Sequence, residues 1–174
     1  NIRVVFPSTS NVYGESGKKN LKETDATAPR FAYAEYKEKI ERKIKELNSN
    51  IVIARIATNY GYSKGIRFNL VINLFCKKIL CNEPLIIFAD GKSYRPYIHV
   101  EDTAKGLILL AEKGISNEVY NLGGENYNIE DLVKLFKKIY PKTLIERKPN
   151  IPSPFTYHVC FNKIESLGFK RKWT

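Results

Sequence analysis

The sequence predicts an α/β protein whose core is a parallel sheet, and three observations lead to this prediction. Hydrophobic residues make up 43% of the chain and charged residues 27%, which is ordinary for a globular protein and excludes disorder. Two apolar, β-branched segments, residues 2–6 and 51–57, have the composition of buried strands. The segment between them has helical periodicity, and strands that alternate with helices are typical of a parallel sheet. A chain of 174 residues suits one domain, or one domain with a small lobe.

The first half of the chain contains a strand, a helix and a second strand. The strand at residues 2–6 ends at Pro7, and a polar turn and a loop rich in glycine and lysine follow. Pro29 is tolerated in the first turn of a helix, which we expect at residues 30–47. Apolar side chains recur in this helix at the spacing of a helix that packs one face on a core. They are Tyr33, Tyr36, Ile40, Ile44 and Leu47.

The second half mixes short strands and helices. We expect helices at residues 68–80, 102–113, 129–140 and 162–167, and strands at residues 85–88, 119–122 and near Leu144. Asp102 is expected to cap the second of these helices, and Asn128 with Asp131 resembles a capping box at the start of the third. Gly168 ends the last helix.

Charge and cysteine content restrict the classes of partner. The net charge is +11, but the 21 lysines are scattered along the chain, so nucleic-acid binding is disfavoured. Cys76, Cys81 and Cys160 lack metal-ligand spacing with either histidine, so we expect buried free thiols in a reducing compartment, the cytoplasm, and no bound metal. The apolar segments are too short to span a membrane. The chain has no methionine and opens within a strand, so we expect residues before Asn1 in the native protein.

Tyr33 and Lys37 have the Y-x-x-x-K spacing within the expected helix. Side chains four positions apart share one helix face, and a nearby ammonium stabilises a phenolate, so a tyrosine in this setting can act as an acid or base. The spacing alone is weak evidence, because Tyr60 and Lys64 repeat it between two glycines in a loop. The first pair, however, follows a strand that ends in the hydroxyl-rich residues 8–10, and ligands of α/β sheets bind at such ends. A Ser/Thr turn that satisfies its own backbone is the alternative.

Six segments carry a more specific pattern. They are S-T-S-N-V-Y-G (residues 8–14), the Y-x-x-x-K pair with Glu41 four residues further on, R-I-A-T-N-Y-G (55–61), P-L-I-I-F-A-D-G (84–91), Y-R-P-Y-I-H-V-E-D (94–102) and Y-N-L-G-G (120–124). In this order they resemble the extended short-chain dehydrogenase/reductase family, and within it the NAD-dependent nucleotide-sugar epimerases and dehydratases. The resemblance implies the C-terminal part of a Rossmann-type parallel sheet plus a small α/β substrate-binding lobe. Residues 1–65 would hold the last Rossmann strands and the catalytic helix, and residues 66–174 mainly the lobe, with residues 95–122 returning toward the Rossmann part.

The resemblance also implies a role for each matching residue. Tyr33 would be the catalytic acid/base, Lys37 would bind the nicotinamide ribose and tune Tyr33, and Thr9 would hydrogen-bond the reacting sugar hydroxyl. Arg95 would hold the nucleotide diphosphate, since a guanidinium binds phosphate oxygens in bidentate fashion; a surface salt bridge is the alternative for this residue. The further residues expected at the cofactor are Ser8, Ile56 and Ala57, and those expected at the substrate are Thr58, Asn69, Leu70, Ile87 and Phe88.

Departures from the family pattern bear on the reaction. Ser10 and Asn11 stand where the 4,6-dehydratases carry Asp and Glu, and neither can act as an acid, so dehydration and Glu-assisted decarboxylation are disfavoured. Thr58 replaces the usual Asn of R-x-x-N, Pro96 replaces a common Asp, and Phe155 stands where an Arg often supports the phosphate. The expected activity is NAD(P)-dependent epimerisation or ketone reduction at a carbon of a nucleotide-diphosphate sugar. The alternative is a catalytically inactive fragment, or a basic binding protein built on the same fold.

The glycine turn with which the family binds NAD, G-x-x-G-x-x-G, is absent from the sequence. That turn receives the cofactor's pyrophosphate after the first strand. We therefore expect most of the NAD or NADP site in an N-terminal half of roughly 100 residues that this chain lacks. Alone, the chain would expose a sheet edge and should be unstable or prone to association. Without the rest of the cofactor site we also expect it to be inactive. The resemblance further implies a homodimer.

Overall fold

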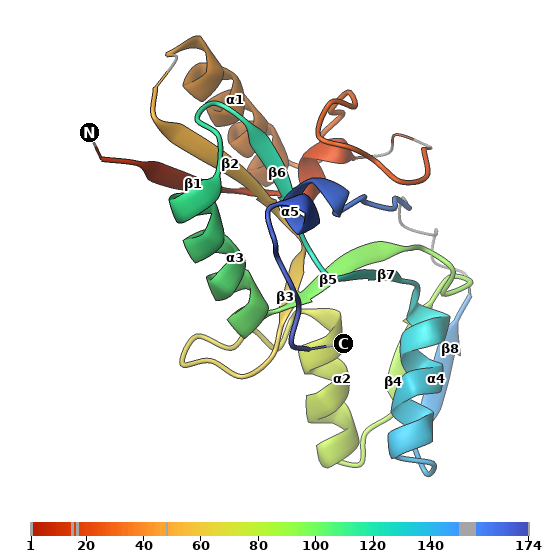
Figure 1. Ribbon diagram of the computed structural model, residues 1–174. Helices are drawn as coiled ribbons and strands as arrows, with labels where there is room; N and C mark the ends of the chain where they lie inside the picture. The colour runs from red at the N-terminus through yellow and green to blue at the C-terminus, as the bar shows by residue number, and fades with distance from the viewer. Residues whose placement is uncertain (1, 15, 17, 48, 150–155, 174) are drawn as a thin grey trace.

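The main sheet is parallel, with helices on both sides. The computed structural model describes residues 2–14, 16, 18–47, 49–149 and 156–173. Strands β1 (Val4–Thr9), β2 (Ile51–Ile56) and β6 (Val119–Leu122) pair in the order β1-β2-β6 (Figure 1). Thr9 is opposite Ile56, and Ile56 is opposite Leu122, so the three carboxyl ends lie at one edge of the sheet. This arrangement confirms the predicted α/β class.

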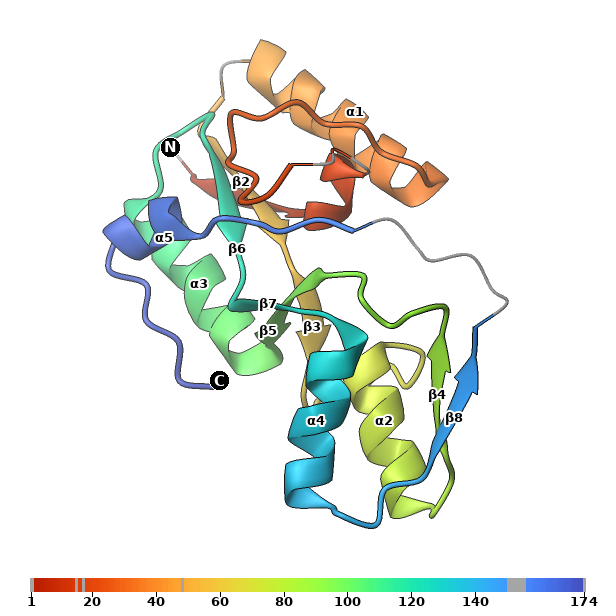
Figure 2. The same ribbon diagram turned by 90° about the vertical axis from the view of Figure 1, so that its right-hand side faces the viewer.

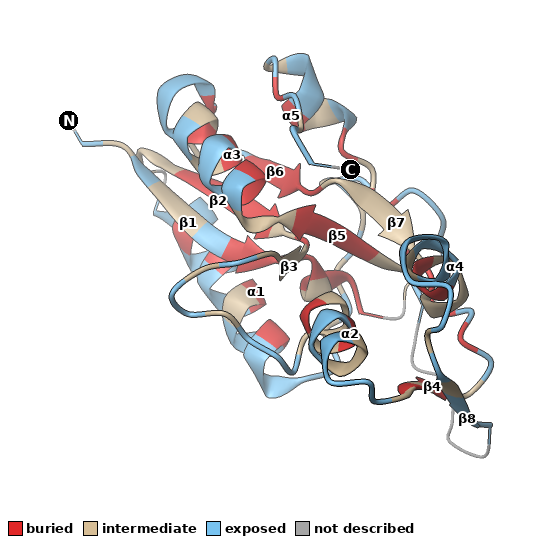
Figure 3. Ribbon diagram, turned by 90° about the horizontal axis from the view of Figure 1, so that it is seen from below, coloured by how far each residue is buried: buried red, intermediate tan, exposed pale blue. Residues whose placement is uncertain are grey.

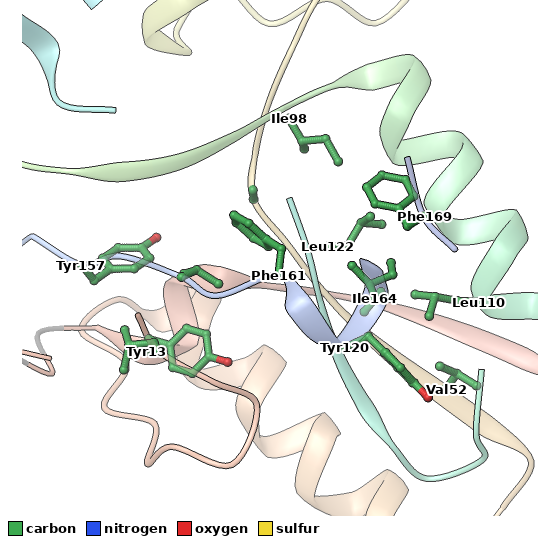
Figure 4. Close-up of a cluster of buried hydrophobic side chains, with 14 residues drawn as sticks. Tyr13, Val52, Ile98, Leu110, Tyr120, Leu122, Tyr157, Phe161, Ile164 and Phe169 are labelled. Carbon is green, nitrogen blue, oxygen red and sulfur yellow. The ribbon is translucent and has the colours of Figure 1, made fainter. Parts of the chain in front are cut away.

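Helices cover both faces of this sheet because its strands carry apolar side chains on both sides. On one face, Ile44 of α1 (Ala32–Glu46) packs with Ile53 and Val119. On the other face, α3 (Val100–Lys113) and α5 (Asn162–Ser166) cover a larger hydrophobic cluster (Figure 4). Its buried members include Val52, Leu110, Tyr120, Leu122 and Ile164.

A second sheet continues from the ends of the first. It contains β3 (Thr58–Tyr60), β5 (Arg95–His99) and β7 (Glu125–Tyr127), with β3 parallel and β7 antiparallel to β5. In Figure 3, β5 is buried over most of its length. These strands were not predicted, because they are short and polar and because Pro96 is atypical of a strand with a neighbour on each side.

A further α/β unit lies in the lower part of Figure 2. There β4 (Leu85–Phe88) pairs in parallel with β8 (Ile145–Lys148), and α2 (Val71–Leu80) and α4 (Ile129–Ile139) pack beside them. Their shared core contains Phe75, Leu85, Ile87 and Val133. The predicted strand at residues 85–88 is confirmed. The predicted cap of α4 is also confirmed, because Asn128 Oδ1 accepts a hydrogen bond of 2.7 Å from the Asp131 N–H.

Two predicted boundaries are wrong. The first strand does not end before Pro7 but runs to Thr9. Within the described residues β1 pairs only with β2, and proline is tolerated in such an edge strand because its missing N–H can face away from the ladder. The helix at Val100–Lys113 is capped by His99, whose Nδ1 accepts from the Glu101 N–H at 3.3 Å, rather than by Asp102. Asp102 lies inside the first turn instead.

The apolar stripe predicted for the first long helix does not face the core. Of its five residues only Ile44 is buried, whereas the others, Tyr33, Tyr36, Ile40 and Leu47, are exposed. The buried face of α1 carries Ala34, Glu38 and Glu41 beside Ile44. The two carboxylates are tolerated there because each has a bonded arginine, Arg42 and Arg55 respectively. The helix therefore turns an apolar surface outward.

The cysteines are also more accessible than predicted. Cys76 and Cys81 are exposed and Cys160 is half-buried. Cys76 lies on the outer side of α2, and Cys81 directly follows that helix, so neither reaches the core. Among the described residues, no helix has both the length and the apolar character needed to cross a membrane. Phe155 lies outside the described residues.

Candidate active site

An open pocket lies at the carboxyl ends of β1 and β2. Its lining comes from three elements that the parallel sheet brings together: the end of β1, the first turns of α1, and the segment after β2. The lining residues are Pro7, Ser8, Thr9, Tyr33, Lys37, Ile56, Ala57 and Asn59. The structure thus gathers in one pocket the residues that the sequence predicted for catalysis and for the cofactor. Asn59 is an addition that the sequence analysis did not single out.

Tyr33 and Lys37 lie one turn apart on the side of α1 that borders the pocket. Lys37 Nζ lies 5.9 Å from the centroid of the Tyr33 ring and 4.7 Å from that of Phe6. The same ammonium donates a hydrogen bond of 2.6 Å to the Pro7 carbonyl oxygen at the end of β1. Tyr33 is 59% exposed, so its phenol is accessible to a ligand. The helix thus places a cation beside an accessible phenol.

Thr9 ends β1 and caps the short 3-10 helix η1 (Ser10–Tyr13). Its side-chain oxygen accepts a hydrogen bond of 3.3 Å from the Asn11 N–H, which is the usual role of a threonine at this position. Because this bond uses an oxygen lone pair, it leaves the hydroxyl hydrogen to donate elsewhere. Thr9 also lines the pocket, so it can offer that hydrogen to an oxygen atom bound there.

A buried ion pair joins β2 to α1, two elements that line the pocket. Arg55 of β2 and Glu41 of α1 are 5% and 3% exposed, and the Arg55 guanidinium reaches Glu41 at distances of 2.7 to 3.2 Å. The Ser8 hydroxyl donates to the same carboxylate. Arg55 also lies 4.8 Å from the centroid of the Tyr13 ring, and burial raises the pKa of Tyr13 to about 12. Glu41 and Arg55 stood in the quoted sequence segments, but nothing in their spacing predicted that they would pair.

Arg95 lies outside this pocket, on β5. One of its Nη atoms donates a hydrogen bond of 2.7 Å to the Tyr94 carbonyl, and its guanidinium carbon lies 5.1 Å from the centroid of the Tyr157 ring. Burial lowers the pKa of Arg95 from its usual value. The phenol of Tyr157 reaches η1, where it donates to Asn11 Oδ1 at 2.8 Å and lies 3.3 Å from Ser10 Oγ. Sequence reasoning missed Tyr157, which is separated from Asn11 by 146 positions.

The remaining residues predicted for the substrate are dispersed. Thr58 is half-buried in β3, next to the pocket residue Asn59, and Leu70 lines a neighbouring hollow with Asn59. Asn69 is exposed before α2. The Ile87 side chain is fully buried in the core between α2 and α4, and Phe88 is half-exposed at the end of β4. The structure does not bring this group into the pocket of Tyr33 and Lys37. Over the described ranges, no cluster of three or more His, Cys, Asp or Glu residues is arranged to hold a metal ion.

Comparisons with known proteins decide the family. Residues 1–123, more than half of the chain, match the model of the NAD dependent epimerase/dehydratase family. The chain belongs to this family. One relative, UDP-glucuronic acid decarboxylase 4 of Arabidopsis thaliana, is 31% identical over 159 residues, which cover 85% of this chain and 36% of the relative.

Solved structures of the family agree with this fold. The dTDP-glucose 4,6-dehydratase of Bacillus anthracis, in complex with NAD, has a TM-score of 0.86 and 25% identity, covering 99% of this chain and 58% of that one. The UDP-glucuronic acid 4-epimerase of Bacillus cereus, in complex with UDP-glucuronic acid and NAD, has a TM-score of 0.84 and 27% identity, covering 98% and 56%. The match spans only 36 to 57% of the length of the first curated relatives. The names of these relatives specify different reactions, so the comparisons show the family but not which reaction this chain takes part in.

Proposed function

We propose that the native protein transfers hydride between NAD(P) and a carbon of a nucleotide-diphosphate sugar, as an epimerase or a ketoreductase. The observation that carries the proposal is the convergence of Thr9, Tyr33 and Lys37 on one pocket at the ends of parallel strands. In this proposal residues 1–65 carry the catalytic side chains and residues 66–174 mainly bind the substrate. The relatives solved with NAD, and one with a UDP-sugar, support the ligand classes.

The three side chains have complementary tasks. Tyr33, as the phenolate, accepts the proton of a sugar hydroxyl while the hydrogen on the same carbon departs as hydride, which leaves a ketone and a neutral phenol. The Lys37 ammonium stabilises the phenolate by its charge. Thr9 donates its hydroxyl hydrogen to the reacting oxygen, and the bond from Asn11 to its lone pair keeps that hydrogen available. For ketone reduction the same steps run in reverse.

The pocket residues suit the nicotinamide end of the cofactor. Lys37 can donate to ribose hydroxyls, and Pro7, Ile56 and Ala57 provide apolar surface for a flat ring. When bound, nicotinamide supplies the hydride acceptor and donor. The sequence has no G-x-x-G-x-x-G turn for the pyrophosphate, so the proposal assigns that end of the cofactor to a part of the native protein outside this chain.

Uncharged residues beside Thr9 favour epimerisation or reduction over dehydration. Elimination of water needs a group that protonates the leaving hydroxyl. Ser10 and Asn11 instead bond to the Tyr157 phenol, and neither a serine hydroxyl nor an asparagine amide can serve as that acid. We also assign Arg95 to the diphosphate, because a planar guanidinium binds phosphate oxygens in bidentate fashion.

We further propose a homodimer that uses α1. Tyr36, Ile40 and Leu47 form an exposed apolar surface on that helix, and exposed apolar surface favours association. Substitution Ile40→Ser is expected to increase the monomer fraction in sedimentation experiments without changing the circular dichroism spectrum. The free, exposed thiols of Cys76 and Cys81 are in keeping with a reducing compartment, for which we propose the cytoplasm.

The decisive experiment uses the native polypeptide, at whatever length it is purified, with UDP- and dTDP-hexoses and NAD or NADP. Product sugars are identified by NMR. Tyr33→Phe is expected to abolish turnover while NAD remains bound, because only the phenolic oxygen is lost. Tyr36→Phe, which alters an exposed tyrosine one turn further along α1, is the matched control and should turn over like the parent. Turnover that survives Tyr33→Phe would contradict the proposal, and steeply salt-dependent RNA binding by an inactive protein would favour a basic binding protein.

A further inference from the structure

Tyr157 is a buried tyrosine whose hydroxyl group bonds to the segment that follows the catalytic strand. Its side chain is 1% exposed and belongs to the main hydrophobic cluster, where Figure 4 shows it near Tyr13 and away from α5. The phenol donates to Asn11 Oδ1 at 2.8 Å and lies 3.3 Å from Ser10 Oγ. Burial raises the pKa of Tyr157, so the phenol keeps its proton and donates throughout the neutral pH range.

These bonds continue to the catalytic hydroxyl. The backbone N–H of Asn11 donates to Thr9 Oγ1 at 3.3 Å, so the side chain of Asn11 is held by Tyr157 and its backbone holds Thr9. The three residues form a short chain from the buried core to the pocket. A shift of η1 would therefore move the Thr9 hydroxyl relative to Tyr33, which stands on a different element.

The other side of Tyr157 is linked to β5. The Arg95 guanidinium carbon lies 5.1 Å from the centroid of the Tyr157 ring, and the Tyr157 N–H donates to the Tyr94 carbonyl at 3.4 Å. One side chain thus contacts both the arginine assigned to the diphosphate and the segment that carries the catalytic threonine. A substrate anchored at Arg95 must present its reacting carbon at Thr9, so the spacing between these two residues matters for the reaction.

We propose that Tyr157 is a positioning residue, which holds Thr9 in its reactive place through Asn11 and couples that place to Arg95. The proposal rests on the proposed function. In it Tyr157 touches neither substrate nor cofactor during the reaction. Its phenol orients the Asn11 amide, and its ring supports the guanidinium.

The substitution Tyr157→Phe separates these two contributions, because it keeps the ring and removes only the hydroxyl. In the native protein we expect kcat to fall about tenfold with KM changed less than twofold, since misplacement of a reacting group slows the chemical step more than binding. Asn11→Ala is expected to lower kcat similarly, and the double variant to lose little more than either alone, because the residues act in series.

Tyr120→Phe is the matched control. Tyr120 is equally buried and its hydroxyl accepts from the Ile115 N–H at 3.2 Å, but it lies in β6 outside the pocket. We expect it to lower the melting temperature and to leave kcat unchanged. If Tyr157→Phe keeps the parental kcat, the proposal is overturned. It is also overturned if Tyr157→Phe only lowers the melting temperature, as Tyr120→Phe does, because Tyr157 would then be a packing residue.

A second measurement keeps this inference separate from the proposed function. Hydrogen exchange of the Asn11 amide reports the bond to Thr9 whether or not the protein turns over. Faster exchange in Tyr157→Phe than in Tyr120→Phe supports the positioning role, whether or not the protein converts a sugar. A lack of turnover would refute only the proposed function. Equal exchange in the two variants would overturn the positioning role.

Discussion

Removal of the Glu41 carboxylate should destabilise the protein more than the loss of any exposed ion pair. In Glu41→Gln the guanidinium of Arg55 stays 5% exposed but loses its counter-charge, and an uncharged amide oxygen replaces the two carboxylate oxygens that it meets at 2.7 to 3.2 Å. Breaking a buried pair by removing one partner costs about 3–5 kcal/mol, because a charge is left without compensation away from water. The Ser8 hydroxyl, which donates to the same carboxylate, loses its charged acceptor as well.

The assay is urea unfolding followed by circular dichroism, together with thermal melting. For a domain of this size each kcal/mol lowers Tm by about 2–4 °C, so a fall of roughly 6 to 20 °C is expected. Glu46→Gln, on the same helix, is the control. Its pair with Lys43 is exposed on both sides and screened by solvent, so its loss should leave Tm almost unchanged.

A double variant tests the cause. Glu41→Leu with Arg55→Leu removes both charges, and it should be more stable than Glu41→Leu alone, because no isolated charge is then buried. The reasoning would be refuted if Glu41→Gln were within about 1 kcal/mol of the parent. That result would mean that Arg55 finds water or another acceptor, and that the pair does not hold α1 against β2.

Two further predictions concern α3. Burial alone would raise the pKa of Asp102, but hydrogen bonds from the N–H groups of Trp173 and Lys172 outweigh burial and hold the pKa below 3.8. The ionised carboxylate therefore stabilises the fold above pH 3.8, and this contribution is lost as the pH falls through the lowered pKa. Asp102→Asn should therefore lower the free energy of unfolding by about 1–3 kcal/mol at neutral pH. In urea titrations the difference in stability between parent and variant should become smaller below about pH 4. Gly106→Ala should destabilise the protein by about 1–3 kcal/mol, because the new Cβ would lie 2.3 Å from Leu122 Cδ1. Gly65→Ala is the control, because its Cβ meets open space and should not destabilise the protein. Equal stability of the two variants would contradict the packing of α3 on β6.

Local sequence signals predicted much of the scaffold. The segment at residues 51–57 became β2 because a run of β-branched and apolar residues favours a strand that is buried on both faces. Asn128 was identifiable as a cap because a side chain that accepts from a helical N–H acts within three residues. The pairing of Tyr33 with Lys37 follows from the pitch of a helix, and their meeting with Thr9 follows from a parallel sheet, which places the ends of its strands at one edge.

Periodicity failed where two faces of one helix competed for the core. The stripe of Tyr33, Tyr36 and Ile40 is more apolar than the face that carries Glu38 and Glu41, yet the latter is buried. Glu41 is tolerated inside because Arg55, on a strand that follows in the sequence, supplies the opposite charge. A pattern read along one helix does not contain that partner, so the wrong face was predicted to be buried.

By itself, the sequence determined the α/β class, the order of most elements and the family, because each depends on neighbouring residues or on motifs in a fixed order. Tertiary structure alone decided which groups surround the Thr9 hydroxyl. Tyr157 reaches Asn11 across 146 positions, and Arg95 of β5 lies beside its ring. Such contacts arise when packing brings remote segments together, and no local periodicity encodes the distance between them. The environment of Thr9 is therefore a property of the folded chain.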